Sequence, residues 1–459
     1  MKNKIISSFI LVLFFALTTQ VKAENSTTVP IATLYNLNSS TTPSSTLTAP
    51  ILPPIISAVK EAKEKLSSVI LNHQLLPVYK KNTKTLLRYN LGSKDIALAI
   101  QDPTTNTTII TIGRQNGKKM IFPDPAVDVS LIRFNGVNSK FQVRKPAGGK
   151  ILALKYLISN PESGSKAKIE AGLIPSLYVP FSNDFAQPDV LKYGADYLNG
   201  IITQVTNELK YLPSNSIPGK EITQAIPPAL IKALVYAEHT DTAQVLYGNN
   251  TQGTIDQLNI LFALNEGDTY KYSVSSAGAR GIAQFMPGTY KGLVERHPEA
   301  GLIKDFVEGM SDHKNSIKAM YMLLDDYAGT VRVKAANSFA EGRVFEYGAA
   351  SYNGGTTRVA RAVNTFGTAW NSDQSGPLNS LRTQVNTLTS QVKNLKVKIK
   401  KANKTEKAIL QTELNSAQNQ LATASNQLTN YKSAILRNET VNYLNKIYKV
   451  IQFFNDHQI

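Results

Sequence analysis

The sequence predicts a mainly α-helical protein, with a mixed α/β region near the N-terminus and a two-armed helical hairpin near the C-terminus. Three observations support this fold class. Residues 85–182 contain β-branched, alternating stretches that are typical of strands. Residues 187–370 carry apolar side chains at helical spacing. Residues 378–435 contain two heptad seams, in which apolar residues recur every three or four positions. The 459 residues are enough for two or three domains.

The first 23 residues have the pattern of an export signal. Two early lysines precede a short apolar run from Ile5 to Leu17, which is too short for a typical membrane span, and residues 21–23 form an acceptable cleavage site. We therefore expect export to the periplasm or the bacterial cell envelope, with no transmembrane span in the mature chain. A retained signal that acts as an anchor is the alternative.

Composition excludes several kinds of site and favours anionic partners. The chain contains no cysteine, which excludes disulfides, thiolate metal sites and lipid attachment at an N-terminal cysteine. Its formal net charge is +17, and 47 basic against 33 acidic residues remain, +14, once residues 1–23 are removed. Such a surface attracts polyanions, which in an envelope are cell-wall glycan, anionic lipid headgroups or teichoic polymers. Nucleic acid is not expected, because the chain shows no nucleic-acid motif.

The segments before residue 187 contain no recognisable catalytic or ligand-binding motif. Residues 24–54 are rich in Ser, Thr and Pro and predict a flexible linker. Residues 55–186 predict a mixed accessory region that begins with a helix within 55–72. Residues 147–158, AGGKILALKYLI, predict a turn and a short helix, and they lack the full spacing of a phosphate-binding loop.

One glutamate lies where a core residue is expected. The segment PPALIKALVYAEH has four apolar residues at core-facing helical spacing: Leu230, Ala233, Leu234 and Ala237. The next position of this stripe is Glu238, and Pro227-Pro228 is suited to a helix start. A carboxylate on a buried face is costly unless it is protonated or paired. A raised pKa is what a general acid needs near neutral pH, so Glu238 is the candidate catalytic acid.

Two strings downstream complete a recognisable pattern, SSAGARGIAQFMPGTY and SYNGG. With Glu238, in this order, they resemble the soluble lytic transglycosylase domain, a member of the lysozyme superfamily. The segment ETVNYLNKIYKV resembles the closing helix of that family, in which a tyrosine lines the cleft. The matching positions are Ser275, Gly278, Ala279, Gly281, Gln284, Tyr352, Asn353, Gly355 and Tyr443.

The resemblance covers about 222–370 and 437–452, and it implies a domain organisation. A lysozyme-like catalytic domain spans 187–370 and is closed by a helix within 437–459. The helical hairpin, 371–436, is then an insertion inside this domain. Its two arms meet near residues 403–406, and the first arm has no acidic residue from 378 to 404 and a run of lysines towards the tip.

The resemblance also implies an activity. The expected reaction is cleavage of the MurNAc–GlcNAc bond in peptidoglycan glycan strands, with formation of 1,6-anhydro-MurNAc ends and without metal or cofactor. Glu238 would act first as acid and then as base on the C6 hydroxyl of the sugar. The expected substrate-binding residues are Ser275, Gly278, Ala279, Gln284, Tyr352, Asn353 and Tyr443. From the residues alone, other roles stay open: turn residues for Gly278 and Gly281, a core residue for Tyr352 and a helix C-cap for Asn353.

The chain departs from the family pattern next to the acid. His239 follows Glu238 where the family usually has serine, and Ala283 replaces a residue that is often Met or Trp. His239 is either a second titrating group or a structural residue. The five histidines show no HExxH spacing, so no metal site is expected.

Two alternatives to the transglycosylase remain. A hydrolytic lysozyme-like muramidase would need a second carboxylate to hold water, for which Asp241 and Asp312 are the candidates. A non-catalytic peptidoglycan-binding scaffold of a secretion machine would act through the hairpin, residues 378–435. The hairpin lysines are a solvated face, a docking tip for an anionic surface, or a contact to an envelope or secretion-system protein. The arms could also pair between two chains.

Overall fold

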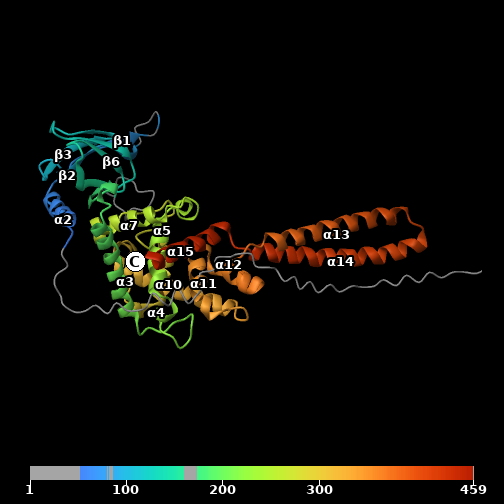
Figure 1. Ribbon diagram of the computed structural model, residues 1–459. Helices are drawn as coiled ribbons and strands as arrows, with labels where there is room; N and C mark the ends of the chain where they lie inside the picture. The colour runs from blue at the N-terminus through green and yellow to red at the C-terminus, as the bar shows by residue number, and fades with distance from the viewer. Residues whose placement is uncertain (1–51, 80, 82–85, 160–172, 458–459) are drawn as a thin grey trace, which may run out of the picture.

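The computed structural model describes residues 52–79, 81, 86–159 and 173–457. The predicted export signal and all but the last residues of the predicted linker lie outside the described residues. Figure 1 shows a sheet region, a helical body and a long hairpin that projects from the body. The predicted fold class, mainly α with an α/β region near the N-terminus, is confirmed. In the described part of the chain, no helix combines the length and apolar character needed to cross a membrane.

The N-terminal region is an antiparallel sheet that packs on one helix. Its elements are α2 (Pro54–Ser67), β1 (His73–Tyr79), β2 (Leu86–Asp102), β3 (Thr107–Asn116), β4 (Lys119–Ile121), β5 (Asp128–Arg133), β6 (Lys140–Lys145), β7 (Lys150–Ser159) and β8 (Leu173–Tyr178). The strand order is β4-β3-β2-β7-β8, with β1 also paired to β2, and β5-β6 form a separate ribbon. All these pairings are antiparallel.

Strand β7 shows that the predicted short helix at 147–158 is wrong. β7 pairs with β2 on one side and with β8 on the other. Residues 151–157 are all buried, so both faces of the strand are covered. A strand covered on both faces reads as a continuous apolar run, which periodicity alone does not distinguish from a buried helix.

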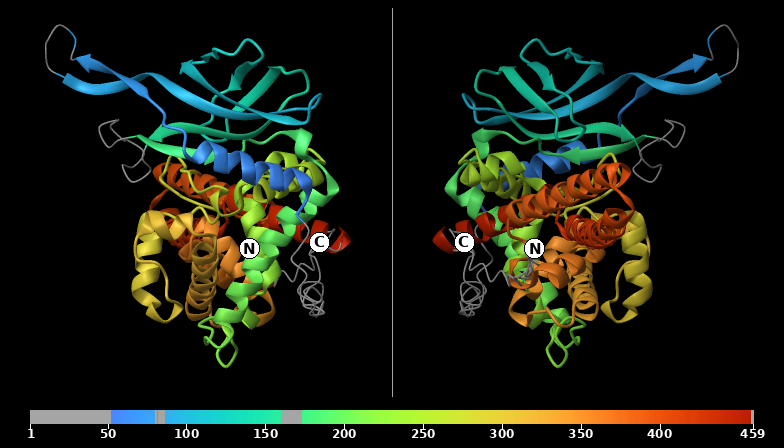
Figure 2. Two further views of the ribbon diagram at one scale, coloured as in Figure 1. Left: turned by 90° about the vertical axis from the view of Figure 1, so that its left-hand side faces the viewer. Right: turned by 90° about the vertical axis from the view of Figure 1, so that its right-hand side faces the viewer.

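Helix α2 joins the sheet to the helical body. Its buried residues pack with small sheet residues such as Ala97 and Ala99 and with the end of α7. The Lys155 ammonium of β7 donates to the carbonyl oxygens of Ser67, the last residue of α2, and Val69, at 2.5 and 2.8 Å. In both views of Figure 2 the sheet lies across one end of the helical body, with α2 beneath it. The sheet region is thus fixed to the body through a continuous apolar layer.

The helical body runs from residue 183 to residue 369. Its elements are η4 (Asn183–Phe185), α3 (Pro188–Leu209), α4 (Ile222–Ala225), α5 (Pro228–His239), α6 (Thr242–Leu246), α7 (Thr251–Asn265), η5 (Glu266–Asp268), α8 (Pro287–Arg296), η6 (Pro298–Ala300), α9 (Phe306–Ser311), α10 (His313–Lys334), η7 (Glu341–Arg343), α11 (Val344–Gly354), α12 (Thr356–Phe366) and η8 (Gly367–Ala369).

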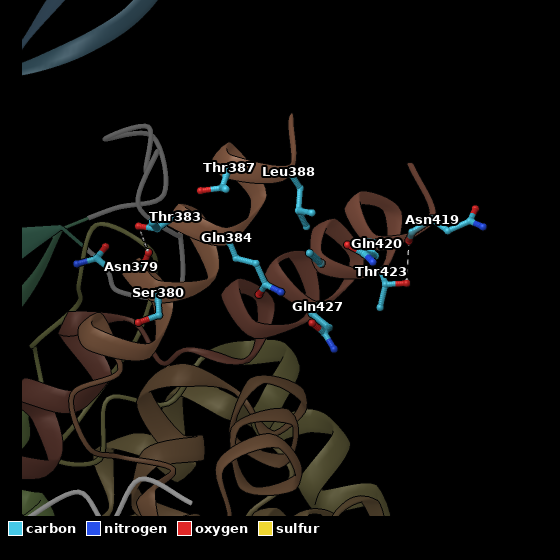
Figure 3. A pocket seen from close by; sticks show the side chains of 11 residues that line it. Asn379, Ser380, Thr383, Gln384, Thr387, Leu388, Asn419, Gln420, Thr423 and Gln427 are labelled. Atoms are coloured by element: carbon cyan, nitrogen blue, oxygen red, sulfur yellow. Dashed lines mark hydrogen bonds between the residues drawn. The ribbon is translucent and has the colours of Figure 1, made fainter. Parts of the chain in front are cut away.

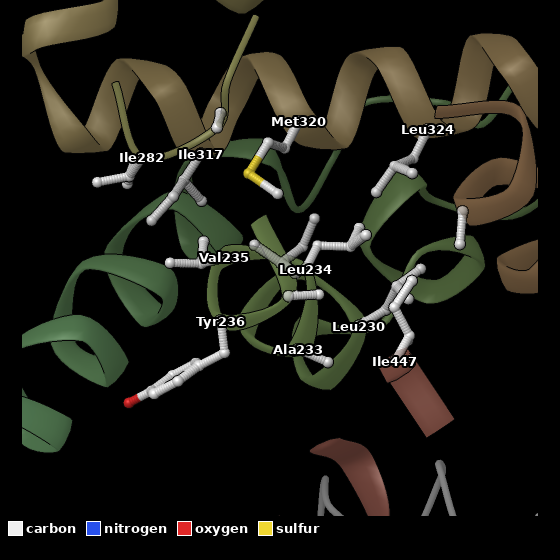
Figure 4. Packing of buried hydrophobic residues seen from close by; sticks show 14 of the residues in the cluster. Leu230, Ala233, Leu234, Val235, Tyr236, Ile282, Ile317, Met320, Leu324 and Ile447 are labelled. Carbon is white, nitrogen blue, oxygen red and sulfur yellow. The ribbon is translucent and has the colours of Figure 1, made fainter. Parts of the chain in front are cut away.

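Helix α5 lies at the centre of this body. It begins at Pro228, with Pro227 as N-cap, as predicted. Residues 230–237 are all buried, so the helix is covered on every side and not only along the predicted stripe. In Figure 4, Leu234 and Val235 face Ile317 and Met320 of α10. A helix enclosed in this way holds its last turn in a fixed position.

The hairpin consists of α13 (Ser375–Lys401) and α14 (Lys404–Ala434). The turn between them is short, and Asn403 caps α14 by accepting hydrogen bonds from the backbone of Thr405 and Glu406. Apolar residues of both arms meet along the seam: Val392, Leu395, Leu414 and Ala417 are buried there. After the hairpin, α15 (Asn438–His457) returns to the body and packs on α5, α6 and α11. The hairpin therefore lies between α12 and the helix that closes the body.

Candidate active site

Glu238 lies in the last turn of α5, where the helix leaves the core. Residues 230–237 are buried, and Glu238 itself is partly buried. Burial raises the pKa of the Glu238 carboxyl above its ordinary value, because the charged form loses hydration. The C-terminal end of a helix is the negative end of its dipole and also disfavours a carboxylate. Both effects favour the protonated form that a general acid requires.

Helix α15 brings the hydroxyl of Tyr443 to this carboxyl. Tyr443 donates a hydrogen bond to Oε1 of Glu238, which lowers the pKa of Glu238 and partly offsets the effect of burial. Burial and the charge of Glu238 raise the pKa of the Tyr443 hydroxyl well above its ordinary value, so this hydroxyl remains a donor at neutral pH. Among the described residues no hydrogen bond reaches Oε2 of Glu238. One carboxyl oxygen is thus held, and the other is available to a substrate.

Lys446, one turn after Tyr443, secures the end of α5. Its buried ammonium donates to the carbonyl oxygens of Ala237 and Thr240, at 2.6 and 3.1 Å. These carbonyls belong to the helix end, where backbone acceptors lack helical partners. Burial lowers the pKa of Lys446, while the nearby Glu238 and Asp241 raise it. The charge of Lys446 in turn lowers the pKa of Glu238. The same side chain therefore both positions the acid and adjusts its pKa.

Tyr352 lies near the acid but bonds elsewhere. It is in the last turn of α11, and its hydroxyl donates to the carbonyl oxygen of Ala283. Its ring packs edge-on against Phe285, with the centroids 5.9 Å apart. Burial and then the charge of Glu238 raise the pKa of the Tyr352 hydroxyl well above its ordinary value. Tyr352 therefore links α11 to the loop before α8 and forms part of the surroundings of the carboxyl.

Asn353 is exposed at the end of α11, next to α15. Its Oδ1 accepts a hydrogen bond from the Thr440 hydroxyl at 3.1 Å. The helix C-cap is Gly355, with φ of +84°, so the alternative role of Asn353 as C-cap is not realised. Among the described residues no hydrogen bond involves the amide nitrogen of Asn353, which is compatible with a contact to a ligand.

The glycine-rich segment forms a tight loop before α8. The Ser275 hydroxyl accepts from the amide of Ala279 at 3.0 Å, so this side chain closes the loop. Gly281 has φ of +70°, and a Cβ there would lie 2.1 Å from the carbonyl oxygen of Met310. This glycine is required by a turn and a close backbone contact, which is the structural role that the sequence left open for Gly281. Gly278 has φ of +95° but open space around it, so it leaves room for a ligand.

Gln284 has an unusual backbone conformation. Its φ is +49°, in the left-handed region that residues other than glycine rarely adopt. Its Nε2 donates to the carbonyl oxygen of Gly281 at 2.9 Å, and its side-chain oxygen Oε1 takes no part in this bond. Such conformations cost about 1–3 kcal/mol and cluster at functional sites. The backbone conformation of Gln284 therefore marks it as a candidate functional residue, and no sequence pattern predicts this conformation.

His239 is a structural residue rather than a second titrating group. Its ring stacks on Tyr270 at 3.6 Å between centroids, and its Nε2 lies 3.0 Å from the carbonyl oxygen of Ile282. Because a carbonyl only accepts, Nε2 carries the proton. Burial lowers the pKa of His239 to about 4, so the ring is neutral at physiological pH. It packs the loop onto the end of α5.

The two carboxylates considered for a hydrolase are helix N-caps. Asp241 accepts from the backbone of Gln244 at the start of α6, and Asp312 accepts from the backbone of Asn315 at the start of α10. Both side chains are thus engaged in capping. Among the described residues, no group of three or more His, Asp or Glu side chains is arranged to hold a metal ion.

Three residues that connect the parts of the site were not predicted from the sequence: Lys446, Thr440 and Tyr270. Lys446 and Thr440 each lie three positions from Tyr443, so they share its face of α15. This spacing is the one signal in the sequence that points to them. Tyr270, with φ of +60°, has no comparable signal.

Comparison with known proteins gives a family match in the central part of the chain. Residues 247–374 match the family model described as the Transglycosylase SLT domain. No curated protein and no solved structure gives a significant match. The segment matched by the family begins after Glu238 and ends before Tyr443, so these two residues are placed by the structure alone. The family supports lytic transglycosylase-type activity on peptidoglycan in general terms and, with it, a place in the cell envelope.

Proposed function

We propose that this chain, which carries a soluble lytic transglycosylase catalytic domain, cleaves the MurNAc–GlcNAc bond of peptidoglycan and forms 1,6-anhydro-MurNAc ends. The observation that supports this most directly is the carboxyl of Glu238. Burial raises its pKa, Tyr443 holds one of its oxygens, and Lys446 fixes the helix end that carries it. A single carboxyl in this setting suits a reaction whose nucleophile belongs to the substrate.

In the proposed reaction Glu238 acts twice. As acid, it donates its proton to the glycosidic oxygen as the bond to C1 of MurNAc breaks. As base, the carboxylate then takes the proton of the C6 hydroxyl of the same sugar, while the C6 oxygen bonds to C1. The carboxyl is protonated again at the end, and no water is consumed. The C6 hydroxyl is already tethered to the reacting sugar, which gives the closing step a high effective concentration.

The other predicted residues surround the acid in this proposal. Tyr443 stabilises the carboxylate formed after the first step. Asn353 and Gln284 offer amide groups to N-acetyl or hydroxyl groups, and Gly278 leaves space for a sugar ring. Tyr352 contributes to the wall of the site. Ser275 and Ala279 support the loop from within rather than by direct contact.

The hydrolytic alternative is less well supported, because both candidate carboxylates cap helices. In the scaffold alternative Glu238 has no catalytic role, so the free-energy cost of burying its carboxyl is left unexplained. We also propose that the protein works in the periplasm or elsewhere in the cell envelope after export. A secretion-system or envelope protein as a partner of the hairpin stays a prediction.

Mass spectrometry of purified peptidoglycan digested with residues 24–459 tests the proposal, with Glu238→Gln as the matched control. We expect muropeptides with 1,6-anhydro ends, each lighter by one water than a reducing-end product, and none with the variant. Reducing ends from the unaltered protein would assign a hydrolase. If neither protein releases products, the scaffold becomes the better account.

A further inference from the structure

The charges of the hairpin are concentrated at its far end. Residues 393–413, defined here as the hairpin tip, contain seven lysines and two glutamates, a net charge of +5. The rest of the hairpin, 375–392 and 414–434, contains only Arg382 and Lys432 as charged residues. A groove of about 980 Å³ on this inner part is lined by uncharged side chains (Figure 3). The positive charge is thus specific to the tip.

The tip lysines are exposed to solvent and form no ion pair with the two glutamates of the tip. All seven are exposed, and none takes part in a salt bridge among the described residues. Some lysines elsewhere are engaged: Lys446 and Lys155 donate to carbonyl oxygens at helix ends. The charge at the tip is therefore available to a partner.

Helix stability does not explain this arrangement. Lys398, Lys400 and Lys401 lie in the last turn of α13, where positive charge is favourable. Lys404 and Lys407, by contrast, lie at the start of α14, where the helix dipole disfavours a cation. Like charges also repel one another across the narrow tip. Lysines at both of these helix ends are therefore not explained by helix stability, which favours a role in binding.

Two apolar side chains are exposed in the same place. Val397 is 47% exposed and Ile409 is 61% exposed, and both lie among the lysines. A soluble polyanion has no apolar surface against which these two side chains could be buried. A bilayer surface can bind both kinds of side chain, because its phosphate headgroups attract the lysines and apolar side chains can enter its headgroup region.

We propose that the hairpin tip docks on a membrane surface rich in anionic phospholipid. The arm is roughly 40 Å long at 1.5 Å per residue, so docking would hold the helical body at about that distance from the membrane. Figure 1 shows the hairpin projecting clear of the body, with its tip at the free end. The proposal rests on the hairpin alone and is independent of the proposed enzyme activity.

Vesicle co-sedimentation of residues 24–459 tests this inference. The vesicles are phosphatidylcholine with or without phosphatidylglycerol. The tip variant replaces Lys393, Lys396, Lys398 and Lys400 with Gln. The matched control replaces four exposed lysines of the sheet region with Gln: Lys118, Lys119, Lys140 and Lys145. Both variants lose the same charge, and thermal unfolding checks that both are folded.

We expect binding that requires phosphatidylglycerol and weakens as salt is added. Each lysine near an anionic surface contributes about a factor of five, so the tip variant should bind roughly 100- to 1,000-fold more weakly. The control should bind as the unaltered protein does, and Val397→Ser with Ile409→Ser should weaken binding at unchanged charge. Equal losses in the two lysine variants, or no binding to anionic vesicles at low salt, would overturn the proposal. Binding of the tip to isolated cell walls or to an envelope protein, without vesicle binding, would overturn it as well.

Discussion

Replacing Tyr443 with Phe removes one hydrogen bond to Glu238 and keeps the ring that packs beside it. The hydroxyl donates to Oε1 of Glu238 and lowers the pKa of that carboxyl. A hydrogen bond to a charged group contributes about 1.5–3 kcal/mol. Since one pKa unit corresponds to about 1.4 kcal/mol, the pKa of Glu238 should rise by about 1–2 units in Tyr443→Phe.

The pH dependence of kcat/KM on soluble glycan strands measures this change. Glu238 must be protonated to act as acid, so activity falls at alkaline pH as the carboxyl loses its proton. In Tyr443→Phe this alkaline limb should move to higher pH by about 1–2 units. The control is Tyr236→Phe, which removes a buried hydroxyl of α5 that bonds to Asn259 instead. A limb that stays in place in Tyr443→Phe, or that moves equally in both variants, would refute the reasoning.

Three further predictions concern the same region. Lys446→Met should also move the alkaline limb of kcat/KM to higher pH, because the charge of Lys446 lowers the pKa of Glu238; an unmoved limb with lower activity would indicate a purely structural role. Glu238→Gln should raise the melting temperature at alkaline pH, and this gain should disappear on acidification. The pKa of Glu238 is raised in the folded state, so the unaltered protein loses stability as the pH rises through that folded-state pKa. Equal melting curves at alkaline pH would contradict this. Gly281→Ala should lower the free energy of unfolding by roughly 3 kcal/mol or more, against about 1 kcal/mol for Gly278→Ala. The reason is that a Cβ at position 281 meets the Met310 carbonyl oxygen, whereas a Cβ at position 278 meets open space. Denaturant unfolding that ranks the two variants in the reverse order would contradict the close contact between Gly281 and Met310.

The sequence predicts those features that depend on local patterns. The start of α5 at Pro228 and the burial of the residues before Glu238 follow from proline placement and apolar spacing. The two hairpin arms follow from their heptad spacing. Strand β7 was wrongly predicted because a strand buried on both faces has no alternation to distinguish it from a helix.

The site could be predicted only in part, because its contacts are far apart in the chain. Tyr443 is 205 positions from Glu238, and Lys446 is 209 positions from Ala237. Tyr443 was found through the family resemblance, and Lys446 was not found. The role of Gly281 likewise depends on the Met310 carbonyl, which belongs to another element. Contacts of this kind become visible only when α15 and the loop before α8 are placed around α5.

The most direct test of the central claim, that Glu238 cleaves the glycan without water, is digestion of peptidoglycan in ¹⁸O-labelled water followed by mass spectrometry. The account predicts anhydro products that contain no ¹⁸O at the new muramic acid end and that disappear with Glu238→Gln. Products that carry one ¹⁸O at a reducing end would show that water is the nucleophile and would contradict it.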